Sequence, residues 1–174
     1  MNIEKYMVKS KKAQIVEELF KYILVGVVAV IILVVGYVSI NAVKDRACKT
    51  EIGKFEIDLR NIDKSLRFGT KEMRSYDAPC NVDRIYFFDL NKKINPENFK
   101  DIPLLKDTLE SGGNNNVFLV KEGEVKRSFY AGNLEIEQPY YLCFIPKFSK
   151  ISFFIEDAGA PVRMASASDN SGCT

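Results

Sequence analysis

Four cysteines are the side chains of this sequence with the most distinctive chemistry, because a thiol can bind a metal, attack a substrate or form a disulfide. They lie far apart, at Cys48, Cys80, Cys143 and Cys173, and no two have the Cys-x-x-Cys spacing of zinc and redox sites. An even number of dispersed cysteines predicts two disulfides in an oxidising compartment. Four buried free thiols in a reducing compartment are the alternative.

Side chains suited to acid–base or metal chemistry are scarce. The sequence contains no histidine, which excludes imidazole bases and every metal motif that needs one. Two carboxylate pairs remain, Glu122 with Glu124 and Glu156 with Asp157, and exposed turn charges are the ordinary interpretation of both. The sequence has neither a glycine-rich phosphate loop nor calcium-loop spacing. We therefore expect no enzyme, no cofactor and no metal site.

The charge distribution argues against a nucleic-acid partner. The net charge is only +2, and acidic and basic side chains balance from residue 44 onward. A protein that binds nucleic acid needs a concentrated basic surface. The apolar content of 47 % with 28 % charged residues is that of an ordinary globular chain.

An uncharged run from Tyr22 to Val43, bounded by Lys21 and Lys44, predicts a transmembrane helix. It extends roughly 33 Å as a helix, enough to cross a hydrocarbon core of about 30 Å, and it is too long for the apolar part of a secretory signal peptide. Basic residues flank both ends equally, so the positive-inside rule does not orient it. Because every cysteine lies after the run, we expect a single-pass protein of the cell membrane with a cytoplasmic N-terminus.

Beyond this run the helix is expected to continue over residues 44–68 as an amphipathic segment. Apolar residues recur there at intervals of three and four, which predicts one apolar seam, and Gly69 comes next as a natural stop. Packing of the seam against a sheet is the preferred interpretation, and a short coiled coil is the alternative. The seam consists of Cys48, Ile52, Phe55, Leu59, Ile62 and Leu66.

Short extended runs then predict an extracytoplasmic antiparallel sheet domain over residues 69–156, with a flexible tail over residues 157–174. A short helix is expected over residues 101–111. The expected strands, of which the last four form two hairpins, are residues 71–77, 84–90, 117–121, 125–130, 140–145 and 151–155. The fold class is therefore α+β: a long N-terminal helix, transmembrane in its lower half and amphipathic in its upper half, packed against a small antiparallel β-sheet.

The residues ahead of the apolar run carry a family resemblance. Lys11 and Lys12 precede Ala13, Gln14 comes directly after it, and Glu18 is the fifth residue counted from Gln14. This pattern before a helix rich in valine and isoleucine resembles the class III signal peptide of archaeal type IV pilin-like proteins. The resemblance is detailed over the leader and the long helix, and beyond them it is one of architecture.

The resemblance implies how the chain is processed and used. A membrane prepilin-type peptidase would remove a cytoplasmic leader, residues 1–13, by cleaving between Ala13 and Gln14. The hydrophobic helix, residues 14–43, would anchor the subunit and later form the core of a filament. The expected partners are the membrane, that peptidase, and further copies of the chain or other pilin-like subunits.

Glu18 and Lys21 are the expected assembly residues. Cleavage gives Gln14 a positive amine, and a carboxylate four residues further on, about 6 Å along the helix axis, suits a neighbouring subunit offset by that step. Lys21 is placed to pair with Glu17 one helical turn away. In a plain membrane anchor these charges are interfacial, with Lys21 reaching the headgroups.

The expected function is therefore that of a pilin-like structural subunit of a cell-surface filament. A monomeric, single-pass, membrane-anchored module that binds an extracytoplasmic ligand is the alternative. Loss of residues 1–13 from the native protein distinguishes the first from the second.

The geometry of the helix and the first strand predicts the disulfide pairing. Cys48 lies roughly 30 Å below the expected helix end, and a strand returning from residue 71 descends about 25 Å. This brings Cys80 near the level of Cys48. We expect Cys48–Cys80 and, by elimination, Cys143–Cys173, while the other two connectivities remain open.

Overall fold

The structure, a computed structural model, describes residues 4–62, 64, 69–157, 161–167 and 173, with side chains from residue 19 onward. The chain divides into two units, residues 1–47 and residues 48–174. Helix α1 (Glu4–Arg60) belongs to both.

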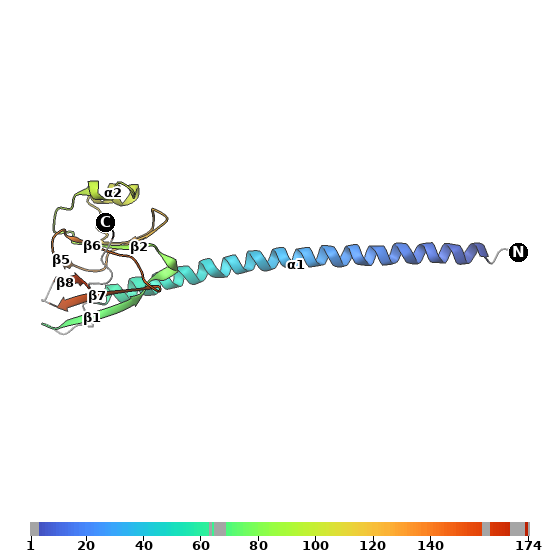
Figure 1. The fold of residues 1–174 in the computed structure, drawn as a ribbon, viewed down its shortest axis with the longest axis horizontal. Coiled ribbons are helices and arrows are strands. Elements are labelled where there is room, and N and C mark those ends of the chain that lie inside the picture. The colour runs from blue at the N-terminus through green and yellow to red at the C-terminus, as the bar shows by residue number, and fades with distance from the viewer. Residues whose placement is uncertain (1–3, 63, 65–68, 158–160, 168–172, 174) are drawn as a thin grey trace. The chain divides into compact units, whose positions relative to one another are not determined.

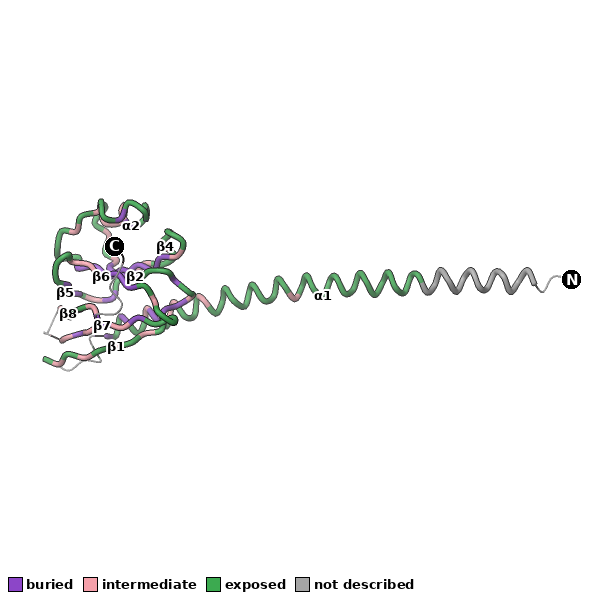
Figure 2. Tube along the Cα trace, in the orientation of Figure 1, coloured by how far each residue is buried: buried purple, intermediate pink, exposed green. Residues whose placement is uncertain are grey.

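The first unit is a helix with an exposed apolar surface. The large apolar side chains of residues 19–43 are each exposed over 48 to 76 % of their area, as Figure 2 shows along the described part of α1. Its helical backbone begins at Glu4, ahead of residue 14, where the hydrophobic helix was expected to begin. The intervening residues include many good helix formers and neither glycine nor proline. No residue between Glu4 and the apolar run therefore interrupts the helix.

The second unit contains two four-stranded sheets, where the sequence predicted one (Figure 1). The first sheet has the order β1-β7-β8-β5 and the second the order β4-β3-β2-β6. The strands are β1 (Lys71–Asp77), β2 (Arg84–Phe88), β3 (Val117–Lys121), β4 (Glu124–Phe129), β5 (Leu134–Ile136), β6 (Tyr141–Phe144), β7 (Lys150–Asp157) and β8 (Val162–Ser166). The shorter helical segments are η2 (Pro79–Asn81), η3 (Pro96–Phe99) and α2 (Pro103–Glu110).

The second sheet is covered on both faces. Ile85 and Phe87 of β2 belong to a core shared with the first sheet and with α1. Tyr86 and Phe88 point the other way, into a second core that includes residues of η3 and α2. Alternate side chains of a strand face opposite sides, so two covered faces explain why β2 is apolar throughout.

The C-terminal part of α1 packs into the first core, as the apolar seam predicts. Phe55 and Leu59 are buried there, and so is Ile62 just beyond the helix. The helix ends at Arg60 rather than at residue 68. At this end the Ile57 carbonyl accepts two hydrogen bonds from Asn61, one from its backbone N–H at 3.1 Å and one from its side-chain amide at 2.9 Å. The predicted seam residue Leu66 lies outside the described residues.

The strands expected to pair over residues 140–145 and 151–155 do not pair with each other. β6 pairs with β2 in the second sheet, whereas β7 pairs with β1 and β8 in the first. Their apolar side chains meet across the core instead, with the rings of Phe144 and Phe153 5.7 Å apart. A connection that crosses between two packed sheets buries both aromatic rings, which a flat hairpin would not do.

The C-terminal segment contributes to the first sheet instead of forming only a flexible tail. β8 lies beyond residue 157 and pairs antiparallel with β7. It also pairs in parallel with β5, a strand that the sequence did not predict. Val162 and Met164 alternate with exposed residues and are buried in the first core, so the segment gains its stability from one apolar face.

Candidate membrane and assembly site

Helix α1 is long and apolar enough to cross a membrane. Among the described residues of α1, the most apolar stretch is not buried by any other part of the described chain. Fully burying a leucine, isoleucine or valine side chain is worth roughly 1.5–3 kcal/mol relative to leaving it in water. A helix that is apolar on all sides therefore needs lipid or other apolar helices around it.

The predicted processing and assembly residues all lie on α1. The backbone is continuously helical through Ala13, Gln14 and Glu18, whose side chains lie outside those described. Lys21 comes next on the same helix, with an exposed side chain. The pairing of Glu18 with a neighbour's amine stays a prediction, since it concerns a second subunit.

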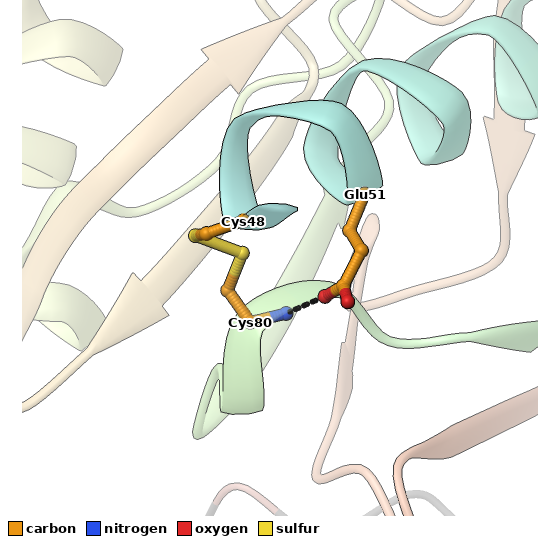
Figure 3. Close-up of a disulfide and its surroundings, with 3 residues drawn as sticks. All are labelled: Cys48, Glu51 and Cys80. Atoms are coloured by element: carbon orange, nitrogen blue, oxygen red, sulfur yellow. Dashed lines mark hydrogen bonds between the residues drawn. A yellow bond between two sulfur atoms is a disulfide. The ribbon is translucent and has the colours of Figure 1, made fainter. Parts of the chain in front are cut away.

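A disulfide between Cys48 and Cys80 links α1 to η2 at the start of the second unit, with the two Cα atoms 5.2 Å apart. The Glu51 side chain lies next to it (Figure 3), and its carboxylate accepts a hydrogen bond from the backbone N–H of Cys80 at 3.0 Å. Cys80 and Asn81 have positive φ angles of 55° and 50°. The disulfide and the carboxylate therefore hold a turn that non-glycine residues rarely adopt.

The second disulfide joins Cys143 of β6 to Cys173, with a Cα separation of 5.8 Å. Cys143 is buried in the second core, and Cys173 packs against the same cluster. All four cysteines are paired. The structure thus has the pairing predicted from geometry, Cys48–Cys80, and the pairing inferred by elimination, Cys143–Cys173.

A shallow groove lies between α1 and β1 beside the first disulfide, lined by polar groups including Glu51, Lys54 and Asp58. Burial raises the pKa of the Tyr76 hydroxyl in this groove, an effect that nearby Arg74 opposes. Within the described part of the chain, His, Cys, Asp and Glu side chains form no cluster of three suited to a metal ion. The residues that line this groove therefore hold α1 against β1 of the first sheet.

The carboxylate pairs singled out in the sequence lie in the second unit, with Glu122 in the turn between β3 and β4 and the other three residues on strands. Glu124 begins β4, and its carboxylate contacts the Lys126 ammonium at 2.5 Å. That contact lowers the pKa of Glu124. Glu156 and Asp157 end β7, where they are partly buried. Because its cationic partner lies only two residues away on the same strand, Glu124 is an ordinary paired charge at the end of a strand.

One exposed aromatic residue was not found by sequence reasoning. Phe148 lies in the connection between β6 and β7, and its side chain is fully exposed, at 101 % of the reference area. The sequence signal for it was a phenylalanine between two lysines in a turn, a weak one because most phenylalanines of this chain pack in a core.

No family model, curated protein or solved structure matches the chain. The fold itself defines an α+β protein in which one long apolar helix leads into a disulfide-bonded domain of two sheets. Two features define this class of protein. One is the exposed apolar surface of the helix, which requires lipid or other apolar helices around it, and the other is the domain attached to its C-terminal end.

Proposed function

We propose that this chain is a pilin-like structural subunit of an archaeal cell-surface filament, held in the cell membrane by α1 before assembly. The observation that carries the proposal is the apolar surface of α1 over residues 19–43, which no other part of the described chain covers. Lipid covers such a surface in a membrane, and α1 helices of neighbouring subunits cover it in a filament.

The two disulfides support an extracytoplasmic location for the second unit. Disulfides persist in oxidising compartments and are rare in the cytosol. Both lie after the apolar run, so the N-terminus is on the cytoplasmic side. The sheet domain then forms the outer surface of the subunit.

The charges near the start of the apolar run fit assembly better than simple anchorage. Glu17 and Glu18 are spaced to pair with Lys21 on the same helix or with the positive amine of a neighbour. Unpaired charges in a packed helical core are costly. Their pairing would set the stagger between subunits.

Intact-mass measurement of the protein from its native membrane tests the proposal. We expect a species that lacks residues 1–13 and begins at Gln14. A matched sample from cells without a prepilin-type peptidase should keep the full N-terminus. Retention of residues 1–13 in both samples would contradict the proposal and favour a monomeric anchored module.

A further inference from the structure

The connection between β6 and β7 ends in a tight turn that displays one aromatic ring. The backbone N–H groups of Lys147 and Lys150 each donate to the other residue's carbonyl at 3.0 Å, which leaves only Phe148 and Ser149 in the loop. Both have positive φ angles, 52° and 57°. This is the geometry of a two-residue type I′ turn, in which asparagine and glycine are the usual residues.

The residues in this turn are unexpected for a purely structural role. A bulky residue with positive φ is an outlier, and such outliers gather at functional positions. The unusual backbone conformation at Phe148 does not serve to bury the ring in the fold, because the ring is completely exposed. Ile145, just before the turn, is also exposed over 43 % of its area.

The turn is tied to the part of the domain where the chain leaves the apolar helix. The backbone N–H of Ala78 donates to the Ser149 carbonyl at 2.8 Å, and the nearby Cys80 is bonded to Cys48. Only residues 44–47 separate Cys48 from Val43, the end of the apolar run. Even a fully extended chain of that length reaches no more than about 17 Å, so chain connectivity keeps Cys48, to which Cys80 is bonded, near the end of the apolar run.

We propose that the turn over residues 147–150 is a second membrane contact, in which the Phe148 ring enters the headgroup region of the bilayer. Tyrosine and tryptophan gather at this depth of a membrane, and phenylalanine enters the boundary of headgroups and acyl chains from the apolar side of interfacial segments. Lys147 and Lys150 flank the ring. The Lys150 ammonium lies 3.9 Å from the Asp77 carboxylate, but its side chain is 64 % exposed, and exposed ammonium groups attract anionic lipid phosphates. The inference rests on the proposed membrane anchorage of α1. The partner that we propose for the turn is the anionic phospholipid surface of the membrane that holds α1.

The absence of tryptophan from the sequence provides a direct test with the full-length protein. Phe148→Trp introduces one indole at the turn, and the protein is reconstituted into vesicles of phosphatidylglycerol with brominated acyl chains. We expect blue-shifted emission that the brominated lipid quenches. Removing the brominated lipid should restore the emission.

Tyr130→Trp is the matched control. Tyr130 is an exposed aromatic residue directly after β4, and strand register places it at the opposite end of the second sheet from Ile145. Its indole should keep red-shifted, unquenched emission in the same vesicles. Equal quenching of both indoles, or none at Phe148→Trp, would overturn the proposal.

Two further measurements separate the ways in which the inference can fail. Resistance of the reconstituted chain to alkaline extraction reports insertion of α1, so extraction into the supernatant counts against membrane anchorage itself. Insertion without quenching at Phe148→Trp counts against the turn alone. A blue shift in detergent that grows with protein concentration would show that the ring packs on a second copy, which also overturns the proposal.

Discussion

Arg127 of β4 lies 3.0 Å from the carboxylate of Glu56 on α1, a contact between residues 71 positions apart in the sequence. The other oxygen of Glu56 lies 2.6 Å from the guanidinium of Arg60. The Glu56 side chain is only 13 % exposed. One largely buried carboxylate thus fixes the end of α1 to the edge strand of the second sheet.

Arg127→Ala should lower the free energy of unfolding by about 0.5–1 kcal/mol, a modest value because the arginine side chain is half exposed. Chemical denaturation of the full-length protein in detergent, followed by near-UV circular dichroism, measures it. The loss should shrink at high salt. Lys126→Ala is the control, since its partner Glu124 lies on the same strand. An equal loss in both variants would show that the contact with α1 contributes nothing specific.

Replacing Cys48 and Cys80 together by serine should cost about 3–4 kcal/mol of stability. The disulfide closes a loop with a sequence separation of 32, and in the chain-entropy model its removal frees that loop in the unfolded state. Thermal unfolding with and without reductant measures the loss, and reductant should weaken the wild type more than the variant. Peptide mapping without reduction that found Cys48 joined to Cys143 would contradict the assignment.

Asn116→Ala should destabilise the protein by about 2–3 kcal/mol, because it leaves one buried and one part-buried backbone group without its side-chain partner. The side-chain carbonyl of Asn116 accepts from the Ala131 N–H at 2.8 Å. Its amide donates to the Gly132 carbonyl at 2.7 Å. Asn115→Ala removes only a part-buried bond to Ser128 and should cost less than half as much in the same unfolding experiment. Equal costs would refute this role for Asn116.

The stability that Glu97 provides should depend on pH. Hydrogen bonds from Lys106 and then Lys100 lower the pKa of Glu97 from 4.5 to about 2. A lowered pKa favours the folded state while the carboxylate is charged, so the contribution is complete above pH 4.5 and is lost as the pH falls through about 2.

Comparison of the wild type with Glu97→Gln in denaturation experiments from about pH 7 to about pH 2 tests this dependence. The difference in stability should be largest at neutral pH and disappear at the acidic end, and added salt should reduce it, because these side chains are exposed. Lys106→Gln should give a difference with the same pH dependence. A difference that grew on acidification would have the wrong sign for this mechanism.

Periodicity along the sequence predicted the elements better than their partners. The helical spacing of Phe55 and Leu59 identified the buried face of α1, and the apolar run of β2 identified a strand. The division into two sheets could not be read in this way, since an apolar strand fits either sheet equally well. The helix ends at Arg60, well before the glycine stop signal at Gly69, and periodicity alone did not locate that end.

For the candidate site, composition was the informative signal. A long uncharged run predicts a membrane-spanning helix whatever domain is attached to it. The exposure of Phe148 was not predictable, because it depends on a turn made by two strands that belong to different sheets. The contact between Glu56 and Arg127 was equally hidden, because charge pairs distant in sequence leave no local pattern.

The final prediction concerns the assembly charges that the proposed function requires. Glu18→Ala should leave processing, membrane insertion and the folded sheet domain unchanged while abolishing filaments. The physical reason is that the amine of Gln14 would then enter a low-dielectric helical core without its carboxylate, at a cost of about 3–5 kcal/mol for every subunit added.

Glu17→Ala is the matched control, because it removes the neighbouring carboxylate, about 100° further round the helix. It should be milder, since Glu17 would pair with Lys21 inside the same subunit rather than with a neighbour. Electron microscopy of cells that contain the assembly machinery measures filament number, and intact mass confirms processing of each variant. Normal filaments with Glu18→Ala, or equal defects in the two variants, would remove the intersubunit pairing from the mechanism. In that case the charges ahead of the apolar run would serve only to position α1 at the membrane surface.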